Sequence, residues 1–204
     1  MKLEHTSNKP FIKVTGQANA GFADCAMAFG ARMLGFVFDR LNPRSISPER
    51  AAGIPSCNIQ RVGIFHESRA EEVIAVMQRA RLDFAQVADG LSTKDAERIG
   101  ARRVIRELRM EHGTSISYIQ MQIDEWAEHC SFFLLVVDGG EVEKVAALQF
   151  NKPWILSVDK EKADMQEMLR NCRPDGVELA DSVEIAPGIQ DAGKILQVIH
   201  ELGK

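Results

Sequence analysis

The feature that most constrains this fold is a regular alternation of short apolar segments with longer segments of helical periodicity. The clearest apolar run, SFFLLVV at residues 131–137, is long enough for one buried strand and far too short to span a membrane. Other short segments have the composition and length of buried strands. Seven of the eight predicted strands cover residues 11–15, 34–38, 58–65, 84–87, 131–137, 154–157 and 177–180, and the remaining one begins at residues 104–105.

Helical patterns separate these strands. Ser47 precedes a proline and a glutamate, which is a typical start of a helix. Ser68 and Glu71 have the spacing of a capping box, and Ser92 stands where it would cap the next helix. The predicted helices cover residues 20–30, 116–126, 141–148, 161–170 and 191–202, with others beginning near residues 48, 68 and 92.

Short buried strands that alternate with helices form a parallel sheet, because each crossover helix covers one of its faces. Eight such units close into a barrel, so we predict an α/β fold, a small single-domain (β/α)8 TIM barrel over residues 1–204. In such a barrel the strand at 11–15 pairs with the strand at 177–180. A doubly wound open sheet is the alternative, but it usually has fewer strands, and the chain lacks a G-x-G-x-x-G motif after its first strand.

Composition and termini exclude several classes of function. The formal net charge of -4 offers no basic surface for nucleic acid or for an anionic membrane. The first ten residues, MKLEHTSNKP, lack the apolar core of a signal peptide. The four cysteines (Cys25, Cys57, Cys130 and Cys172) are widely spaced, and neither they nor the histidines fall at metal-ligand spacing. We therefore expect a cytoplasmic protein with free thiols, without a metal or other cofactor, that binds a small molecule at the C-terminal face of the barrel.

Residues 35–49, GFVFDRLNPRSISPE, indicate where that small molecule binds. Residues 36–38 form a short strand, a polar loop follows, and a helix begins after Ser47. The loop stands at the carboxyl end of a strand, where β/α folds place their chemistry. We therefore predict that Arg44 in this loop binds the ligand.

Several short segments, taken in order, carry a resemblance to a known family. They are KVTG at 13–16, GFVF at 35–38, NPR at 42–44, SPE at 47–49, RVGIF at 61–65, Gln86, VI at 104–105, GV at 176–177, SVE at 182–184 and PG at 187–188. Their order and spacing resemble phosphoribosylanthranilate isomerase, the small β/α barrel of tryptophan biosynthesis, over residues 12–199. The resemblance implies the same barrel that the alternation of strands and helices predicts.

The resemblance also implies an Amadori rearrangement, in which an aminoaldose becomes an aminoketose. This reaction needs an acid that protonates the ring oxygen and a base that takes the proton from C2 of the sugar. By the family's pattern, Asp138 corresponds to the acid and Arg44 to the arginine that meets the anthranilate carboxylate. The family's base is a cysteine that ends the first strand, and this position is Thr15 here. A threonine hydroxyl does not ionise near neutral pH, so it cannot serve as the same base.

The residues that would hold the substrate also depart from the family. Lys13 is expected in the barrel interior, where its charge needs partners. Gln86 matches the first residue of the family's Gln-Leu-His-Gly segment, and the next three residues differ. The phosphate loops have lost their glycines: Asp159 follows the seventh strand, and Asp181 and Ser182 follow the eighth. Glycines let backbone N–H groups approach a phosphate, so side chains crowd both loops.

Two hypotheses of function follow. In the first, the chain is an active isomerase in which His66, at the end of the third strand, acts as the base, because histidine titrates near neutral pH. In the second, the chain is a diverged paralogue that binds or converts another small molecule, and an acidic face suits a cation or an amine. That face comprises Asp89, Asp138, Asp159, Glu178 and Asp181, with Arg44 opposite. The missing base and the altered loops predict weak or no isomerase turnover, which Thr15→Cys alone does not restore.

Overall fold

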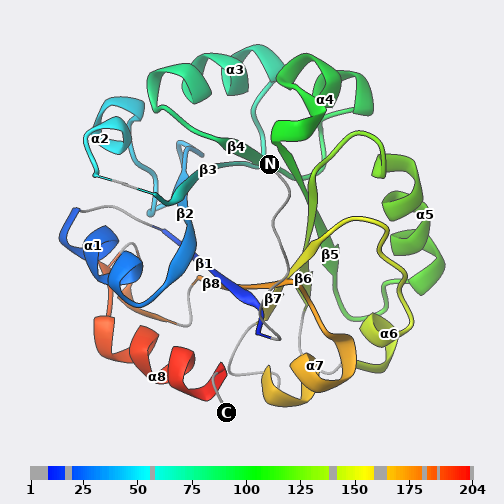
Figure 1. The fold of residues 1–204 in the computed structure, drawn as a ribbon. Coiled ribbons are helices and arrows are strands. Elements are labelled where there is room, and N and C mark those ends of the chain that lie inside the picture. The colour runs from blue at the N-terminus through cyan, green and yellow to red at the C-terminus, as the bar shows by residue number, and fades with distance from the viewer. Residues whose placement is uncertain are drawn as a thin grey trace.

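The computed structural model describes residues 9–16, 20–55, 58–137, 142–158, 165–180, 183–187 and 189–202, and it confirms the predicted barrel. Eight parallel strands form one closed sheet, and the helices lie around it as an outer ring (Figure 1). The barrel strands are β1 (Phe11–Thr15), β2 (Ala31–Val37), β3 (Gln60–Phe65), β4 (Phe84–Val87), β5 (Val104–Met110), β6 (Phe132–Val137), β7 (Trp154–Val158) and β8 (Gly176–Leu179). The open-sheet alternative is wrong, because β1 pairs with both β2 and β8.

The helices lie close to their predicted positions. They are α1 (Ala20–Ala28), α2 (Pro48–Ala52), α3 (Ala70–Arg79), α4 (Thr93–Ile99), α5 (Ile116–Trp126), α6 (Val142–Ala146), α7 (Met165–Cys172) and α8 (Ala192–Leu202), with a short 3-10 helix η1 (Ala101–Arg103) before β5. The start of the predicted helix at 161–170, residues 161–164, lies outside the described residues. None of the helices in the described ranges is long and apolar enough to cross a membrane.

Of the two predicted N-terminal helix caps, at Ser68 and Ser92, one is present. Ser92 caps α4: its hydroxyl accepts from the backbone N–H of Asp95 (3.3 Å), and the Asp95 carboxylate accepts from the backbone N–H of Ser92 (3.0 Å). The prediction at Ser68 is wrong, because the N-cap position of α3 is one residue later and has no side-chain hydrogen bond. The acidic residue of that pattern, Glu71, pairs with Arg98 of α4 instead (2.5 Å).

The first and last strands pair, as predicted, and their register brings polar residues together. Lys13 of β1 is the register partner of Glu178 of β8. On the other side of β1, Thr15 lies opposite Gly35 of β2. These pairings place a lysine, a threonine and a glutamate at the closure point of the barrel.

The barrel interior has an apolar layer and a polar layer. The buried side chains of the apolar layer are Met33, Val62, Ile105, Phe132, Leu134 and Ile155. The polar residues that the barrel strands bury include Lys13, Thr15, Gln86, Glu107, Ser157 and Glu178. A larger apolar cluster packs the outer face of the strands against the helices. Because buried charges need partners, the polar layer is where a functional site is expected.

Strand β5 departs most from the sequence prediction. Its start is as predicted, but it continues through charged residues to Met110. Alternation along the strand sends Glu107 into the interior, whereas Arg106 lies on the outer side, with its guanidinium 4.5 Å from the ring centre of Trp126 in α5. Charged residues give no signal of a buried strand, because several of the partners that neutralise them, such as Asp89 and His66, come from other parts of the chain.

A hairpin that was not predicted, β9 (Glu184–Ala186) and β10 (Ile189–Gln190), follows β8. The side-chain amide of Gln190 donates to the carbonyl of Gly16, so the hairpin covers the end of β1. Gly16 has a φ of +86°, and a Cβ there would lie 2.8 Å from Oε1 of Glu184. Only glycine combines this backbone conformation with so close an approach.

Candidate active site

A cavity of about 320 Å³ opens at the carboxyl ends of the barrel strands. Ligand pockets typically measure about 300–1,000 Å³, so this one suits a compact small molecule. Its polar lining comprises Thr15 of β1, Asn42 and Arg44 after β2, His66 after β3, Gln86 of β4, Glu107 and Arg109 of β5, Ser157 of β7 and Glu178 of β8. Such a convergence of charged groups in a concave site is typical of a catalytic or binding centre.

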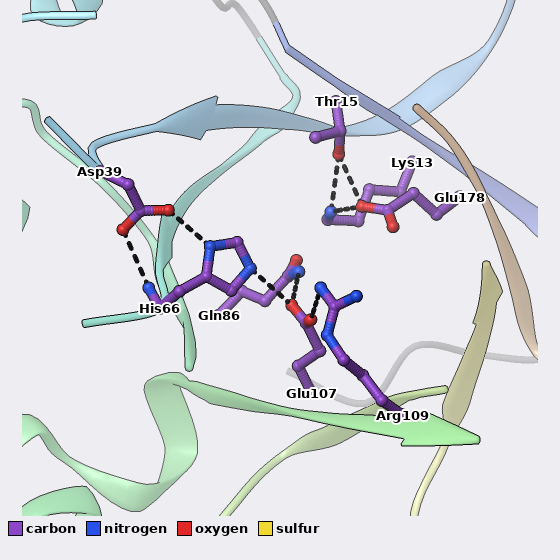
Figure 2. Close-up of polar contacts among 8 residues, drawn as sticks. All are labelled: Lys13, Thr15, Asp39, His66, Gln86, Glu107, Arg109 and Glu178. Carbon is purple, nitrogen blue, oxygen red and sulfur yellow. Dashed lines mark hydrogen bonds and ion pairs between the residues drawn. The ribbon is translucent and has the colours of Figure 1, made fainter. Parts of the chain in front are cut away.

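The first polar cluster lies where β1 meets β8 (Figure 2). Lys13 forms an ion pair with Oε1 of Glu178, and its Nζ donates to Oγ1 of Thr15 (2.8 Å). The Thr15 hydroxyl donates in turn to the same glutamate oxygen (2.7 Å). The side chain of Lys13 is 0% exposed and that of Glu178 is 5% exposed. Lys13 therefore has the interior partners that its charge requires.

The second cluster is centred on His66 (Figure 2). Its Nδ1 lies 2.5 Å from Oδ2 of Asp39, its backbone N–H donates to the other oxygen of Asp39 (3.0 Å), and its Nε2 lies 3.3 Å from Oε2 of Glu107. The hydrogen bonds to Asp39 and then to Glu107 raise the pKa of His66 from 6.5 to about 10, although burial acts in the opposite direction. At neutral pH His66 is therefore an imidazolium that donates from both ring nitrogens.

Both carboxylate oxygens of Glu107 are engaged. Nη2 of Arg109 donates to Oε1 (2.6 Å), and Nε2 of Gln86 donates to Oε2 (2.7 Å), which also faces His66. Burial acts to raise the pKa of this carboxyl, but the hydrogen bond from His66 and the charge of Arg109 outweigh it and lower the pKa to about 2. Glu107 is therefore a fixed anion that holds two cations and an amide in place.

These contacts argue against His66 as a general base. A base needs an unprotonated nitrogen aimed at the substrate, whereas both nitrogens of His66 face carboxylates. A pKa of about 10 leaves roughly one His66 in a thousand neutral at pH 7. The residue instead places a fixed positive charge in the cavity wall.

Arg44 lines the cavity, and the hairpin orients it. Its Nε lies 3.0 and 2.9 Å from the two carboxylate oxygens of Glu184 in β9, and its Nη2 lies 2.7 Å from Oε2. The side chain of Asn42 accepts from the backbone N–H of Arg44 (2.9 Å), which orders the loop. Because this pairing fixes the plane of the guanidinium, the group is positioned at the cavity before a ligand arrives.

The predicted site residues divide into three groups. Those that line the cavity are Thr15, Arg44, His66 and Gln86, and Lys13 contacts two lining residues from within the barrel. Those that lie outside the described residues are Asp138, Asp159, Asp181 and Ser182. The sequence did not identify Glu107, Arg109 or Glu184. Glu107 and Arg109 are two residues apart, which places both on one face of a strand, so extending β5 to Met110 would have found them.

The stability difference between the wild type and His66→Gln is expected to depend on pH. The folded-state pKa of His66, about 10, exceeds 6.5, so its ion pairs contribute fully below pH 6.5 and are lost as the pH rises through 10. The pKa of Glu107, about 2, lies below 4.5, so its contribution is full above pH 4.5 and is lost as the pH falls through 2. The difference in melting temperature is therefore largest between pH 4.5 and 6.5 and smaller at pH 10. Thermal unfolding measured at these pH values tests this, and a difference independent of pH would contradict it.

A closed β/α barrel with a charge-lined cavity at the carboxyl ends of its strands defines a TIM barrel whose site has the composition of an active site. The family profile described as N-(5'-phosphoribosyl)anthranilate (PRA) isomerase matches residues 12–201. The chain belongs to this family, and the resemblance drawn from its short segments is confirmed.

Individual relatives agree with this assignment. The chain is 34% identical over 201 residues to N-(5'-phosphoribosyl)anthranilate isomerase of Desulfovibrio desulfuricans, with 95% of each chain covered. It is similar to the crystal structure of phosphoribosyl anthranilate isomerase from Thermus thermophilus, with a TM-score of 0.79 and 28% identity over 95% of this chain and 98% of that one. It shares its fold with a phosphoribosyl anthranilate isomerase in complex with reduced 1-(o-carboxyphenylamino)-1-deoxyribulose 5-phosphate, with a TM-score of 0.78 and 22% identity over 95% and 98% of the two chains.

Proposed function

We propose that this chain catalyses the reaction of its family, the Amadori rearrangement of N-(5'-phosphoribosyl)anthranilate in tryptophan biosynthesis. The observation that carries the proposal is the cavity at the carboxyl ends of the strands, which brings Thr15 and Arg44 from separate family segments into one site. The related isomerase that binds a reduced deoxyribulose phosphate supports a ligand with a benzoate, a hydroxylated chain and a phosphate. Of the described cysteines, Cys25 and Cys130 are free thiols, which supports a reducing cytoplasm as its location.

The cavity wall offers groups for two parts of this ligand. We assign Arg44 to the anthranilate carboxylate, because Glu184 holds its guanidinium at the cavity. We assign Gln86 to a sugar hydroxyl. Its Oε1 is buried without a hydrogen-bond partner in the described part of the chain, whereas its Nε2 is fixed by Glu107. Buried polar atoms are nearly always hydrogen-bonded, so a ligand hydroxyl would satisfy this oxygen.

The remaining assignments follow the family pattern alone. Asp138, after β6, is proposed as the acid that protonates the ring oxygen. The phosphate is proposed to lie against the segments after β7 and β8, which contain Asp159, Asp181 and Ser182. In β/α barrels these two segments are the usual phosphate site.

The alternative function, a diverged barrel for a cation or an amine, has less support from the described residues. It depends on an acidic face, but Lys13 balances the charge of Glu178, and Asp89 pairs with Arg106 (2.7 Å) rather than lining the cavity. The imidazolium of His66 adds positive charge to the same wall. A cationic ligand would meet like charge there, whereas an anionic one would meet opposite charge.

The proposed function predicts that the purified chain converts phosphoribosylanthranilate, followed as the loss of anthranilate fluorescence. This is the opposite of the weak or absent turnover that the missing thiol and the altered loops predict, so the same assay decides between the two expectations. In Arg44→Met we expect KM to rise about 10–100-fold, because a hydrogen bond to a charged group contributes about 1.5–3 kcal/mol. The kcat changes less, since this contact is remote from the reacting carbons. Arg40→Met is the matched control in the same loop, because the Arg40 side chain is 90% exposed and does not line the cavity. A folded wild type without turnover would contradict the proposed function.

A further inference from the structure

The described lining of the cavity contains few groups that can take a proton from carbon. Thr15 occupies the position of the family's base, and its hydroxyl does not ionise near neutral pH. His66 is protonated, and both of its nitrogens face carboxylates. Glu107 has both oxygens engaged and a pKa of about 2. Among the described lining residues, the carboxylate of Glu178 remains.

Glu178 lines the cavity, and its two carboxylate oxygens differ in their contacts. Oε1 accepts from the hydroxyl of Thr15 (2.7 Å) and from the ammonium of Lys13. In the described part of the chain Oε2 has no protein hydrogen bond, and in Figure 2 no dashed line joins it to the other residues drawn. Because the side chain lines the cavity and is only 5% exposed, Oε2 is a nearly dehydrated acceptor at the cavity surface.

We propose that Glu178 is the general base of the isomerisation, in place of the family's thiol. Its carboxylate contacts Thr15 directly, so it reaches the part of the substrate that a side chain at position 15 would reach. Lys13 and Thr15 are positioning residues, because their two hydrogen bonds to Oε1 fix the carboxylate and leave Oε2 to accept the proton. Carboxylates remove protons next to carbonyl carbons in other isomerases. This inference rests on the proposed function and names the residue that carries its central step.

The proposed step balances without an oxidant or a reductant. Once the acid has protonated the ring oxygen and the C1–O bond has broken, C1 is an iminium carbon. Oε2 of Glu178 takes the proton from C2, the C2–H electron pair forms the C1=C2 bond, and the C=N π pair moves to nitrogen. The product of this step is an enolamine. Glu178 then returns its proton to C1 while the C2 hydroxyl proton goes back to the acid, which gives the aminoketose and restores both groups.

Glu178→Gln tests the base directly, because glutamine keeps the shape and the hydrogen-bond acceptor but cannot take a proton. We expect kcat to fall about 10²–10⁴-fold, while KM stays within about threefold, since binding contacts are unchanged. The deuterium isotope effect on kcat with C2-deuterated substrate should rise, because proton removal becomes rate-limiting. A purely structural role would lower the amount of active protein without changing the isotope effect.

Glu107→Gln is the comparison variant, since Glu107 is also a buried carboxylate of the cavity. Its oxygens are both engaged, so its loss of kcat should be smaller than that of Glu178→Gln, with an unchanged isotope effect. If the two variants lose kcat equally and show equal isotope effects, the assignment is overturned. Such a result would mean that kcat depends on the net charge of the cavity and not on proton removal by Glu178.

Rescue by a different base provides a second test. Adding Thr15→Cys to Glu178→Gln places a thiol where the family has its base, and we expect kcat to recover at least about tenfold. In the wild-type background Thr15→Cys should bring no comparable gain, because Glu178 already takes the proton. A thiol that raises kcat equally in both backgrounds would overturn the assignment.

Glu178→Gln leaves the ammonium of Lys13 buried without its counter-charge, and this destabilises the fold. The double variant Lys13→Met with Glu178→Gln removes both charges and should fold, with kcat as low as in Glu178→Gln. If this neutral pair keeps the wild-type kcat, the assignment is overturned. If the wild type is active and Glu178→Gln is equally active, only the assignment of Glu178 as the base is overturned. If the wild type is inactive, both the proposed function and this assignment are overturned.

Discussion

Replacing Arg61 by methionine is expected to destabilise the fold by about 3–5 kcal/mol. Arg61 lies in β3 and is only 6% exposed. Its Nη1 donates to the carbonyl of Ile54 (3.0 Å), and its Nη2 donates to those of Ala51 (2.5 Å) and Ala80 (3.1 Å). The guanidinium also lies over the ring of Phe36, 4.7 Å from its centre. One side chain thus ties the C-terminal ends of α2 and α3 to the barrel.

The size of this loss of stability follows from the hydrogen-bond acceptors that methionine leaves without a donor. Burial lowers the pKa of the Arg61 guanidinium, but an arginine side chain keeps its charge near neutral pH. Methionine has a similar length and keeps the contact with Phe36, yet it removes the donors of three carbonyls in buried surroundings. Hydrogen bonds to charged groups contribute about 1.5–3 kcal/mol each and are not additive here, because they share one side chain.

Chemical denaturation measures this change as a loss of unfolding free energy. Arg79→Met is the matched control, because Arg79 of α3 pairs with Glu49 of α2 and so links the same two helices. Both side chains of that pair are more than half exposed, at 59% and 63%, so its removal should have a small effect. Equal losses of stability in the two variants would contradict the role given to the buried guanidinium.

Gly35→Ala is expected to lower kcat about 10–100-fold while the protein remains folded. Gly35 lies opposite Thr15 in the pairing of β2 with β1. A Cβ at Gly35 would stand 2.5 Å from Oγ1 of Thr15 and 3.2 Å from its Cα, so the threonine must move. The hydroxyl that moves is a donor to Glu178, and a shift of about 1 Å in a reacting group is enough for a hundredfold loss of rate.

The neighbouring strand provides the control for this prediction. A Cβ at Gly63 of β3 would contact Leu82, and it would stand 2.7 Å from the ring of Phe65, both of which belong to the cluster between strands and helices. Gly63→Ala should therefore lower the melting temperature without changing the kcat of the folded protein. A Gly35→Ala variant that loses only stability, as Gly63→Ala does, would show that the position of Thr15 does not matter for catalysis.

Much of the fold was predictable because its signals are local. The run at 131–137 forms β6, and the strand at 84–87 has the predicted bounds. The helix at 116–126 matches α5, and the cap at Ser92 forms from residues three apart. Each of these depends on the periodicity or the hydrogen bonding of neighbouring residues, which sequence displays directly.

The candidate site was predictable only in part. The family segments identified Thr15 and Arg44, and both line the cavity. Glu107 was missed because a glutamate inside a barrel has no sequence signature until its partners are known. Two of those partners, Gln86 and His66, belong to β4 and to the end of β3, about twenty or more residues earlier in the chain.

By itself, the sequence determined the number of β/α units and the barrel, because both follow from local periodicity. It also determined the family and the positions of the family's base and arginine, because these follow from short segments in a fixed order. Tertiary structure decided the chemistry of the cavity. The closure of β1 against β8 places Glu178 on Thr15, and the hairpin after β8 places Glu184 on Arg44. These contacts join residues more than a hundred positions apart. Buried charges are stable only when they are paired, and the pairs form only in the folded chain. No pattern along the sequence could therefore have shown which carboxylate oxygen is left to accept a proton.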